Sequence, residues 1–227
     1  MRPPAPDLPA PDLADGAALD EAGAVAALVG RDPMFRTCID AAGPLPPLVL
    51  RPRGFPGLVH IILEQQVSTA AARAMFAKLA ALLPGLAPGD FLTLDDPALK
   101  SCGFSRPKAA YARGLATALI EGRLDLGALH AAPDAAAMAA LTSLKGFGRW
   151  SAECYLLLHL GRPDLWPADD LAVQLGVQEL RGLPRRPTRQ ELDALAESWR
   201  PYRSTAARLI WHWYVNARRR TRPAPSA

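Results

Sequence analysis

The sequence predicts an all-α protein, and two observations support this prediction. Apolar residues recur at positions i, i+3, i+4 and i+7 along most of the chain, which is the stripe that a helix turns toward a core. The alternation of apolar and polar residues that marks a half-buried strand is nearly absent, and only residues 49–51 could form one. Half of the 227 residues are hydrophobic, so the chain can bury a substantial core as one medium domain or two small lobes.

The first part of the chain contains one segment that is not expected to pack and two predicted helices. Residues 1–16 hold five prolines and are expected to be disordered. The apolar pattern predicts a helix over residues 19–30, and Asp32 followed by Pro33 predicts the start of a second. Residues 43–56 are rich in proline and predict an extended connection.

Only helical patterns follow this connection. Ser68 and Asp170 stand at the start of two of them and are residue types that cap helix N-termini. The predicted helices span residues 57–64, 68–83, 97–102, 107–121, 124–130, 134–143, 150–160, 170–181, 188–198 and 202–218. Residues 219–227 are predicted to form a basic tail.

The charge of the chain is unevenly distributed. The formal net charge is only +4, but the chain carries no Asp or Glu from residue 200 onward. The same segment contains seven arginines: Arg200, Arg203, Arg208, Arg218, Arg219, Arg220 and Arg222. This end of the chain could lie on a polyanion, and the alternative is a solvated basic tail.

The cysteines and the hydropathy indicate the compartment. Cys38, Cys102 and Cys154 are scattered, so they predict neither a disulfide framework nor an iron–sulfur site. No apolar run is long enough to predict a membrane span, and the N-terminus lacks the pattern of a secretory signal. We therefore expect an intracellular, cytoplasmic protein without a cofactor.

The segment at residues 144–152, Leu-Lys-Gly-Phe-Gly-Arg-Trp-Ser-Ala, predicts a hairpin that binds an anion. Gly146 and Gly148 can adopt the positive φ values that other residues resist, and they let the backbone approach a ligand closely. A predicted helix follows, and free backbone N–H groups at a helix start favour a phosphate. The acidic pair Asp169 and Asp170 comes after that helix, where a short loop can bring a carboxylate back to the hairpin.

Four sequence blocks together resemble the helix-hairpin-helix (HhH-GPD) DNA glycosylase superfamily, and within it the 3-methyladenine DNA glycosylase II branch, which repairs alkylated bases. The blocks are residues 61–68, 99–116, 144–152 and 165–174, and the resemblance covers about residues 21–216. About 60 residues precede the first block, so we expect this chain to lack the N-terminal β domain of the best-known bacterial members.

The resemblance implies a glycosylase domain over residues 17–218, made of two helical lobes with the active-site cleft between them. The N-terminal and C-terminal helices would form one lobe. The other would be a central lobe, about residues 57–160, that carries the hairpin at residues 142–152. The implied partner is double-stranded DNA that contains a damaged base, and the implied state is a monomer.

Asp170 is the candidate catalytic residue. Cleavage of an N-glycosidic bond builds oxocarbenium character on the sugar, which a nearby carboxylate stabilises while it orients a water molecule. The family's aspartate is followed three residues later by an apolar helix residue, here Val173, so Asp170 matches better than Asp169. The alternative is that Asp170 only caps a helix; on the catalytic interpretation, Asp169 is the cap or a bystander.

The residue at position 150 distinguishes two kinds of glycosylase, those with a lyase step and those without one. Bifunctional members of the superfamily place a Schiff-base lysine two residues after the second hairpin glycine, and Trp150 occupies that position here. An indole cannot form an imine, and Lys145, inside the hairpin, suits a phosphate contact better. The resemblance therefore implies a monofunctional glycosylase that uses water, without a lyase step.

Aromatic residues are the candidates for the base pocket. An N-alkylated purine is positively charged, so an electron-rich ring can hold it by stacking and cation–π attraction. Trp150 is the first candidate; Tyr155, Trp166 and Trp211 are further candidates, each of which could equally belong to the core. Cys154 stands where the best-known bacterial pattern has a pocket tyrosine.

The resemblance also implies how the protein contacts DNA. Gln66 occupies the family's wedge position, where a side chain fills the gap left by a flipped base; the alternative is a polar interhelical loop with Ser68 as cap. The expected DNA-contacting residues are Gln65, Gln66, Ser68, Lys145, Gly146, Phe147, Gly148 and Arg149. The family's pattern further implies a monovalent cation, Na⁺ or K⁺, held by the carbonyls of Thr142, Leu144 and Phe147.

The leading hypothesis is thus a monofunctional DNA glycosylase of base excision repair that excises alkylated purines, 3-methyladenine first and 7-methylguanine as a second candidate. Two alternatives stay open. One is a glycosylase for another lesion, such as hypoxanthine or an oxidised purine. The other is a non-catalytic helix-hairpin-helix DNA-binding protein, which would not require an acid at Asp170.

Overall fold

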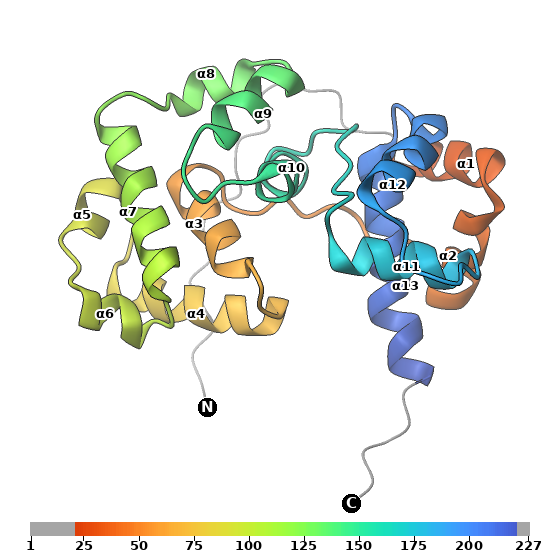
Figure 1. The fold of residues 1–227 in the computed structure, drawn as a ribbon, viewed down its shortest axis with the longest axis horizontal. Helices are drawn as coiled ribbons and strands as arrows, with labels where there is room; N and C mark the ends of the chain where they lie inside the picture. The colour runs from red at the N-terminus through yellow and green to blue at the C-terminus, as the bar shows by residue number, and fades with distance from the viewer. Residues whose placement is uncertain (1–20, 222–227) are drawn as a thin grey trace, which may run out of the picture.

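A computed structural model describes residues 21–221, and every regular element in this part of the chain is helical (Figure 1). The predicted all-α class is confirmed. The elements are α1 (Glu21–Arg31), α2 (Pro33–Ala42), α3 (Gly54–Glu64), α4 (Thr69–Leu82), α5 (Pro88–Leu92), α6 (Asp96–Ser101), α7 (Arg106–Ile120), α8 (Leu126–Ala131), α9 (Asp134–Thr142), α10 (Arg149–Leu158), α11 (Leu171–Leu180), α12 (Arg189–Ala196), the short 3-10 helix η1 (Glu197–Trp199) and α13 (Arg203–Thr221). The segment expected to be disordered, residues 1–16, and tail residues 222–227 lie outside the described residues.

The described helices form two groups, which we call the terminal lobe and the central lobe. The terminal lobe consists of α1, α2, α11, α12, η1 and α13, in which α13 packs on α1, α2 and α11 (Figure 1). Asp32 connects the two ends of the chain there: it caps α2 and accepts hydrogen bonds from Arg181, at the end of α11, and from Trp199 Nε1 in η1. These donors follow Asp32 by more than 140 residues, so the terminal lobe is built from segments far apart in the sequence.

The central lobe consists of α3 to α10. Helix α3 lies at its centre and contacts α4, α7 and α10, and the side chains of Leu58, Ile61 and Ile62 are completely buried. Helix α10 also packs on α9 and lies between the two groups of helices (Figure 1). Its side chains from Ser151 to Leu157 are all buried, so its position is fixed by packing along most of its length.

Two irregular segments join the lobes. Residues 43–53 run from α2 to α3, and residues 159–170 return from α10 to α11. The backbone N–H of Arg51 donates to the carbonyl of Leu158 at 3.0 Å, but residues 49–51 form no strand. The return segment places Asp170 directly before α11 and beside the N-terminal turn of α10.

Among the described residues, no helix combines the length and the apolar character needed to cross a membrane. The predicted helix limits differ from the observed ones by at most three residues, at the start of α3 and at the end of α13. Helix α13 thus continues through residues 219–221, which had been assigned to the tail. The five-residue helix α5 was not predicted.

Candidate active site

The side chain of Asp170 accepts hydrogen bonds from three different elements. Oδ1 accepts the backbone N–H of Val173 at 3.0 Å and the indole Nε1–H of Trp211 at 2.9 Å. Oδ2 accepts the indole Nε1–H of Trp150 at 2.9 Å. An ionised carboxylate has about four acceptor sites, so Oδ2 retains capacity for one further donor. The half-buried carboxylate is therefore fixed in place and still able to contact a sugar or a water molecule.

The capping role belongs to Asp170 and not to Asp169, which corrects the division of roles suggested by the sequence. Asp170 is the N-cap of α11, and its neighbour Asp169 is exposed. The nearest cation to Asp169 is Arg189, at 3.9 Å and on the surface. Asp170 is thus a cap and a candidate catalytic group at once, because the cap uses only one lone pair of Oδ1.

Trp150 and Trp211 reach Asp170 from opposite lobes. Trp150 is in the first turn of α10, in the central lobe, and Trp211 is on α13, in the terminal lobe. Both tryptophans are half-buried residues, and the Nε1–H of each indole is directed at the carboxylate. This arrangement combines a fixed negative charge with two electron-rich rings, which suits a cationic aromatic ligand.

Tyr155 and Trp166 do not line this site, and the expectation that they do is corrected. Neither side chain is exposed by more than 1 %. The Tyr155 hydroxyl accepts the backbone N–H of Gly54 at 3.0 Å, and Trp166 Nε1 donates to the carbonyl of Leu192 at 3.1 Å. Both are core residues that satisfy their polar atoms inside the protein.

Cys154 lies one helical turn after Trp150 and is completely buried. Burial raises the pKa of its thiol, and the negative charge of Asp170 adds to this effect. The thiol is therefore neutral at physiological pH and behaves as a small apolar side chain of the core.

The hairpin between α9 and α10 depends on its two glycines for different reasons. Gly146 has a φ of 91°, and a Cβ atom there would lie 2.2 Å from the ring of Tyr111 on α7. Gly148 is extended, with a φ of −86°, and a Cβ atom there would meet nothing within 4 Å. The expectation of positive φ thus holds for Gly146 only, and Gly148 leaves open space at the start of α10.

In the turn between α3 and α4, Gln66 is exposed to solvent, whereas Gln65 bonds to other parts of the protein. Gln66 is exposed and has a φ of 58°, a left-handed conformation that is uncommon for residues other than glycine. Gln65 Nε2 donates to the carbonyl of Gly146 at 2.8 Å and to Ser151 Oγ at 3.0 Å. Its amide therefore ties the turn to the hairpin, and Gln65 is not free to bind DNA. Ser68 caps α4 through a hydrogen bond from the backbone N–H of Ala71, as the sequence suggested.

The charged residues of the hairpin differ in their environment. Lys145 is exposed at the tip. Arg149 instead bonds to two carboxylates, those of Glu153 and Asp193, so its guanidinium is engaged inside the protein, and its expected contact with DNA stays a prediction. Burial raises the pKa of Glu153 to about 7, although the hydrogen bond and the charge of Arg149 act in the opposite direction.

The expected cation site stays a prediction. The side chain of Phe147 is buried, so only its backbone is available for contacts with an ion or with DNA. The carbonyl of Leu144 accepts the backbone N–H of Phe147 at 3.0 Å, and its second lone pair could bind a cation. Thr142 ends α9, so its carbonyl is one of the groups that a helix leaves without an internal partner.

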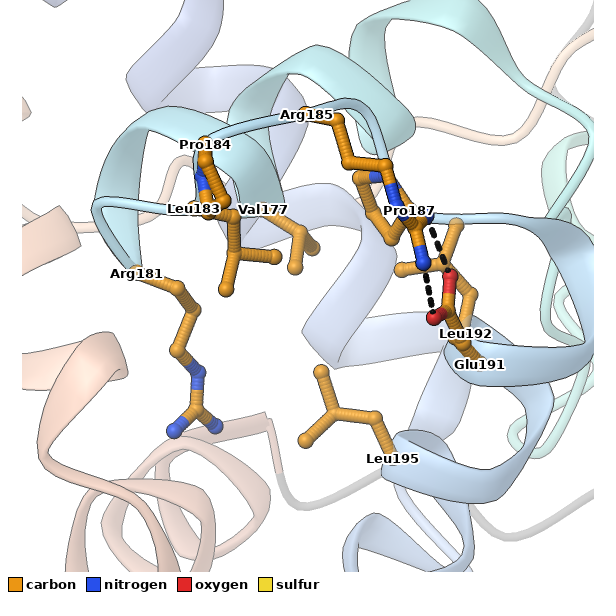
Figure 2. A pocket seen from close by; sticks show the side chains of 9 residues that line it. All are labelled: Val177, Arg181, Leu183, Pro184, Arg185, Pro187, Glu191, Leu192 and Leu195. Carbon is orange, nitrogen blue, oxygen red and sulfur yellow. Dashed lines mark hydrogen bonds and ion pairs between the residues drawn. The ribbon is translucent and has the colours of Figure 1, made fainter.

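Two further pockets lie outside the Asp170 site. One has a volume of about 400 Å³ and is formed in the terminal lobe by α11, α12 and the connection between them (Figure 2). Leucine and proline side chains line most of it, and Arg185 lies at its rim, paired with Glu191 (Figure 2). The other, about 260 Å³, lies between α3, α4 and the end of α10 and includes His60 and His159. Asp170 lines neither of them.

Comparison with known proteins gives consistent matches. Residues 59–201 match the family described as the HhH-GPD superfamily of base excision DNA repair proteins. The DNA-3-methyladenine glycosylase 1 of Schizosaccharomyces pombe is 30% identical over 158 residues, which are 68% of this chain and 69% of that protein.

Two solved structures show the same fold. The S. pombe 3-methyladenine DNA glycosylase in complex with abasic DNA has a TM-score of 0.78 at 27% identity, covering 83% of this chain and 95% of the other. A DNA-3-methyladenine glycosidase from Bacillus halodurans has a TM-score of 0.70 at 30% identity, covering 86% and 89%.

Proposed function

The chain belongs to the HhH-GPD superfamily of base excision DNA repair proteins, and we propose that it is a monofunctional DNA glycosylase that excises alkylated purines. The observation that carries this proposal is the Asp170 carboxylate, held by three hydrogen bonds, two of them from the indoles of half-buried tryptophans. The names of the relatives, which are 3-methyladenine glycosylases, support the choice of substrate class.

The proposed reaction is hydrolysis of the bond between the base and C1′ of the deoxyribose. An N-alkylated purine is cationic, so it takes the bonding electron pair and leaves as a neutral base. The positive charge moves to the sugar as an oxocarbenium ion, which Asp170 stabilises by its negative charge. A water molecule adds to C1′ and gives up a proton, for which the carboxylate is the acceptor.

The aromatic residues explain how a cationic base would be held. The rings of Trp150 and Trp211 are both anchored to Asp170 through their Nε1–H groups. Stacking and cation–π attraction to such rings favour a positively charged base over a neutral one. We infer 3-methyladenine as the first substrate and 7-methylguanine as a second.

A reaction that uses water fits the positions of the lysines. Trp150 occupies the position of the Schiff-base lysine in bifunctional members of the superfamily. Lys145 is exposed in the hairpin, and the Lys108 ammonium donates to the carbonyl of Leu63 at 2.8 Å. We therefore expect base release without strand cleavage.

We further infer that the protein binds double-stranded DNA as a monomer, inside the cell, through the hairpin and the turn that carries Gln66. The backbone N–H groups at the start of α10 favour a phosphate, and the missing side chain of Gly148 allows the backbone to approach it. Gln66 would enter the base stack when the damaged nucleotide is flipped out.

The deciding experiment is to incubate the protein with methylated DNA and to identify the released bases by chromatography. We expect 3-methyladenine in the supernatant and intact DNA strands before alkaline treatment. The absence of every methylpurine would contradict the proposal. DNA containing hypoxanthine or an oxidised purine then tests a different lesion, and binding without any release would indicate a non-catalytic protein.

A further inference from the structure

Arg149, the first residue of α10, uses its guanidinium to connect the two lobes. Two of its nitrogens form a fork with Asp193 on α12, at 2.9 and 3.0 Å, and Nε donates to Glu153 Oε1 at 2.7 Å. A fork of two parallel hydrogen bonds fixes orientation as well as distance. The side chain therefore holds the start of α10 in one position relative to α12.

The neighbouring residue makes a second connection in a different direction. Successive side chains on a helix diverge by about 100° around its axis. Arg149 reaches α12 while Trp150 reaches Asp170 at the cap of α11. The first turn of α10 is thus bonded to the terminal lobe in two directions, which restricts its orientation as well as its distance from that lobe.

We propose that Arg149 and Asp193 are a positioning pair, which holds Trp150 and the hairpin in register with the Asp170 carboxylate. The proposal rests on the glycosylase function proposed above and adds two residues that touch neither base nor sugar. Arg149 would thereby set the distance between the phosphate bound at the hairpin and the carboxylate at the sugar.

The pair is suited to precise positioning rather than to stabilising the fold. About a third of each side chain is exposed, at 35% and 33%, and ion pairs exposed to this extent add little to the free energy of unfolding. Catalysis is more sensitive, because a misplacement of about 1 Å can lower a rate by about 100-fold.

The test uses Asp193→Asn, Asp193→Glu and Arg149→Lys in the full chain. Asparagine loses the charge and one acceptor of the fork, glutamate keeps both oxygens, and lysine keeps the charge but loses the fork. We expect Asp193→Asn and Arg149→Lys to lower the single-turnover rate of base release by about 10- to 100-fold. Asp193→Glu should recover most of that loss, while affinity for DNA containing an abasic site stays within about two-fold of wild type in all three.

The matched control is Arg185→Gln, which removes another arginine–carboxylate pair from α12, since Arg185 bonds to Glu191. Its rate should equal that of the wild type. A wild-type rate in Asp193→Asn would overturn the proposal. So would a loss of DNA affinity in Arg149→Lys as large as its loss of rate, because Arg149 would then be a phosphate contact.

A second readout does not depend on activity. The indole N–H signal of Trp150 in a ¹H–¹⁵N NMR spectrum, assigned with Trp150→Phe, reports its hydrogen bond to Asp170. Asp193→Asn should shift that signal and leave unchanged the signal of the buried indole of Trp199, which donates to Asp32. An unchanged Trp150 signal in Asp193→Asn overturns the positioning role. If the signal shifts in this variant but the wild-type protein releases no base, only the glycosylase function is refuted.

Discussion

Replacing Asp170 with asparagine separates the structural role of this side chain from its chemical role. The amide oxygen can keep both hydrogen bonds that Oδ1 accepts, from Val173 and from Trp211. The amide NH2 would replace Oδ2 and face the Nε1–H of Trp150, and two donors cannot bond to each other. The structural loss is one hydrogen bond to a charged acceptor, about 1.5–3 kcal/mol, or about 3–12 °C in Tm for a chain of this size.

The chemical loss is larger. Without the negative charge, the oxocarbenium ion loses its main electrostatic partner, and removal of one such group lowers rates by about 10²–10³-fold, or about 2.7–4 kcal/mol in activation free energy. We expect Asp170→Asn to stay folded and to bind DNA while its base release falls by at least this factor.

The assay combines three measurements on the same preparation: single-turnover base release from methylated DNA, DNA affinity by fluorescence anisotropy, and Tm by circular dichroism. Asp169→Asn is the control, because Asp169 is exposed and its ion pair with Arg189 is long, at 3.9 Å. It should keep the rate and change stability by less than about 0.5 kcal/mol. Base release at the wild-type rate in Asp170→Asn would refute the mechanism. If the variant lost DNA affinity by the same factor as it lost rate, the lower rate would be due to weaker binding and not to lost chemistry.

Four further outcomes are expected. Gly146→Ala forces a Cβ atom against the ring of Tyr111 at a φ of 91°. It should lower the stability by at least about 1–3 kcal/mol, measured as a lower Tm, and should also weaken DNA binding. Gly148→Ala meets no protein atom within 4 Å, so Tm should stay constant while anisotropy shows weaker DNA binding; equal effects of both substitutions would contradict this distinction. Gln66→Ala should slow base release from duplex DNA by about 10-fold and leave release from single strands unchanged, and equal slowing on both would argue against a wedge. Burial raises the pKa of Glu153 to about 7, so its protonated form is favoured by folding, and the free energy of unfolding should fall as pH rises from about 4.5 to about 7, by on the order of 3 kcal/mol. Urea unfolding of Glu153→Gln should lack that dependence, and a wild-type pH profile in the variant would assign it to another group.

The sequence predicted the helices because each helix carries its own apolar stripe. A stripe is a local pattern, so helix limits could be placed within three residues without knowledge of the fold. Helix α5 spans five residues, fewer than two turns, and is too short to show a stripe. Asp170 and Gln66 could be chosen as candidates from the sequence because each stands in a motif of neighbouring residues.

The environment of single side chains could not be predicted in the same way. An aromatic residue in a helical pattern looks the same whether it faces the core, as Tyr155 does, or the junction of the lobes, as Trp211 does. Arg149 was expected to contact DNA because it belongs to the hairpin segment. Its ion pair with Asp193, which follows 44 residues later, was not predicted, because an ion pair between distant segments leaves no local signal.

The hydrogen bonds from the Gln65 amide to Gly146 and Ser151 have a consequence for the DNA. They hold the hairpin and the turn that presents Gln66 at one spacing, so both elements meet the DNA at a set distance from each other. On the function proposed above, a duplex that binds the hairpin by a phosphate and admits Gln66 into its stack must itself bend or unstack to fit. The energy of deformation then falls on the DNA, and it is smallest where a damaged or mispaired base has already weakened the stacking. Part of the selectivity for lesions would thus come from the stiffness of the double helix, before any base reaches Asp170.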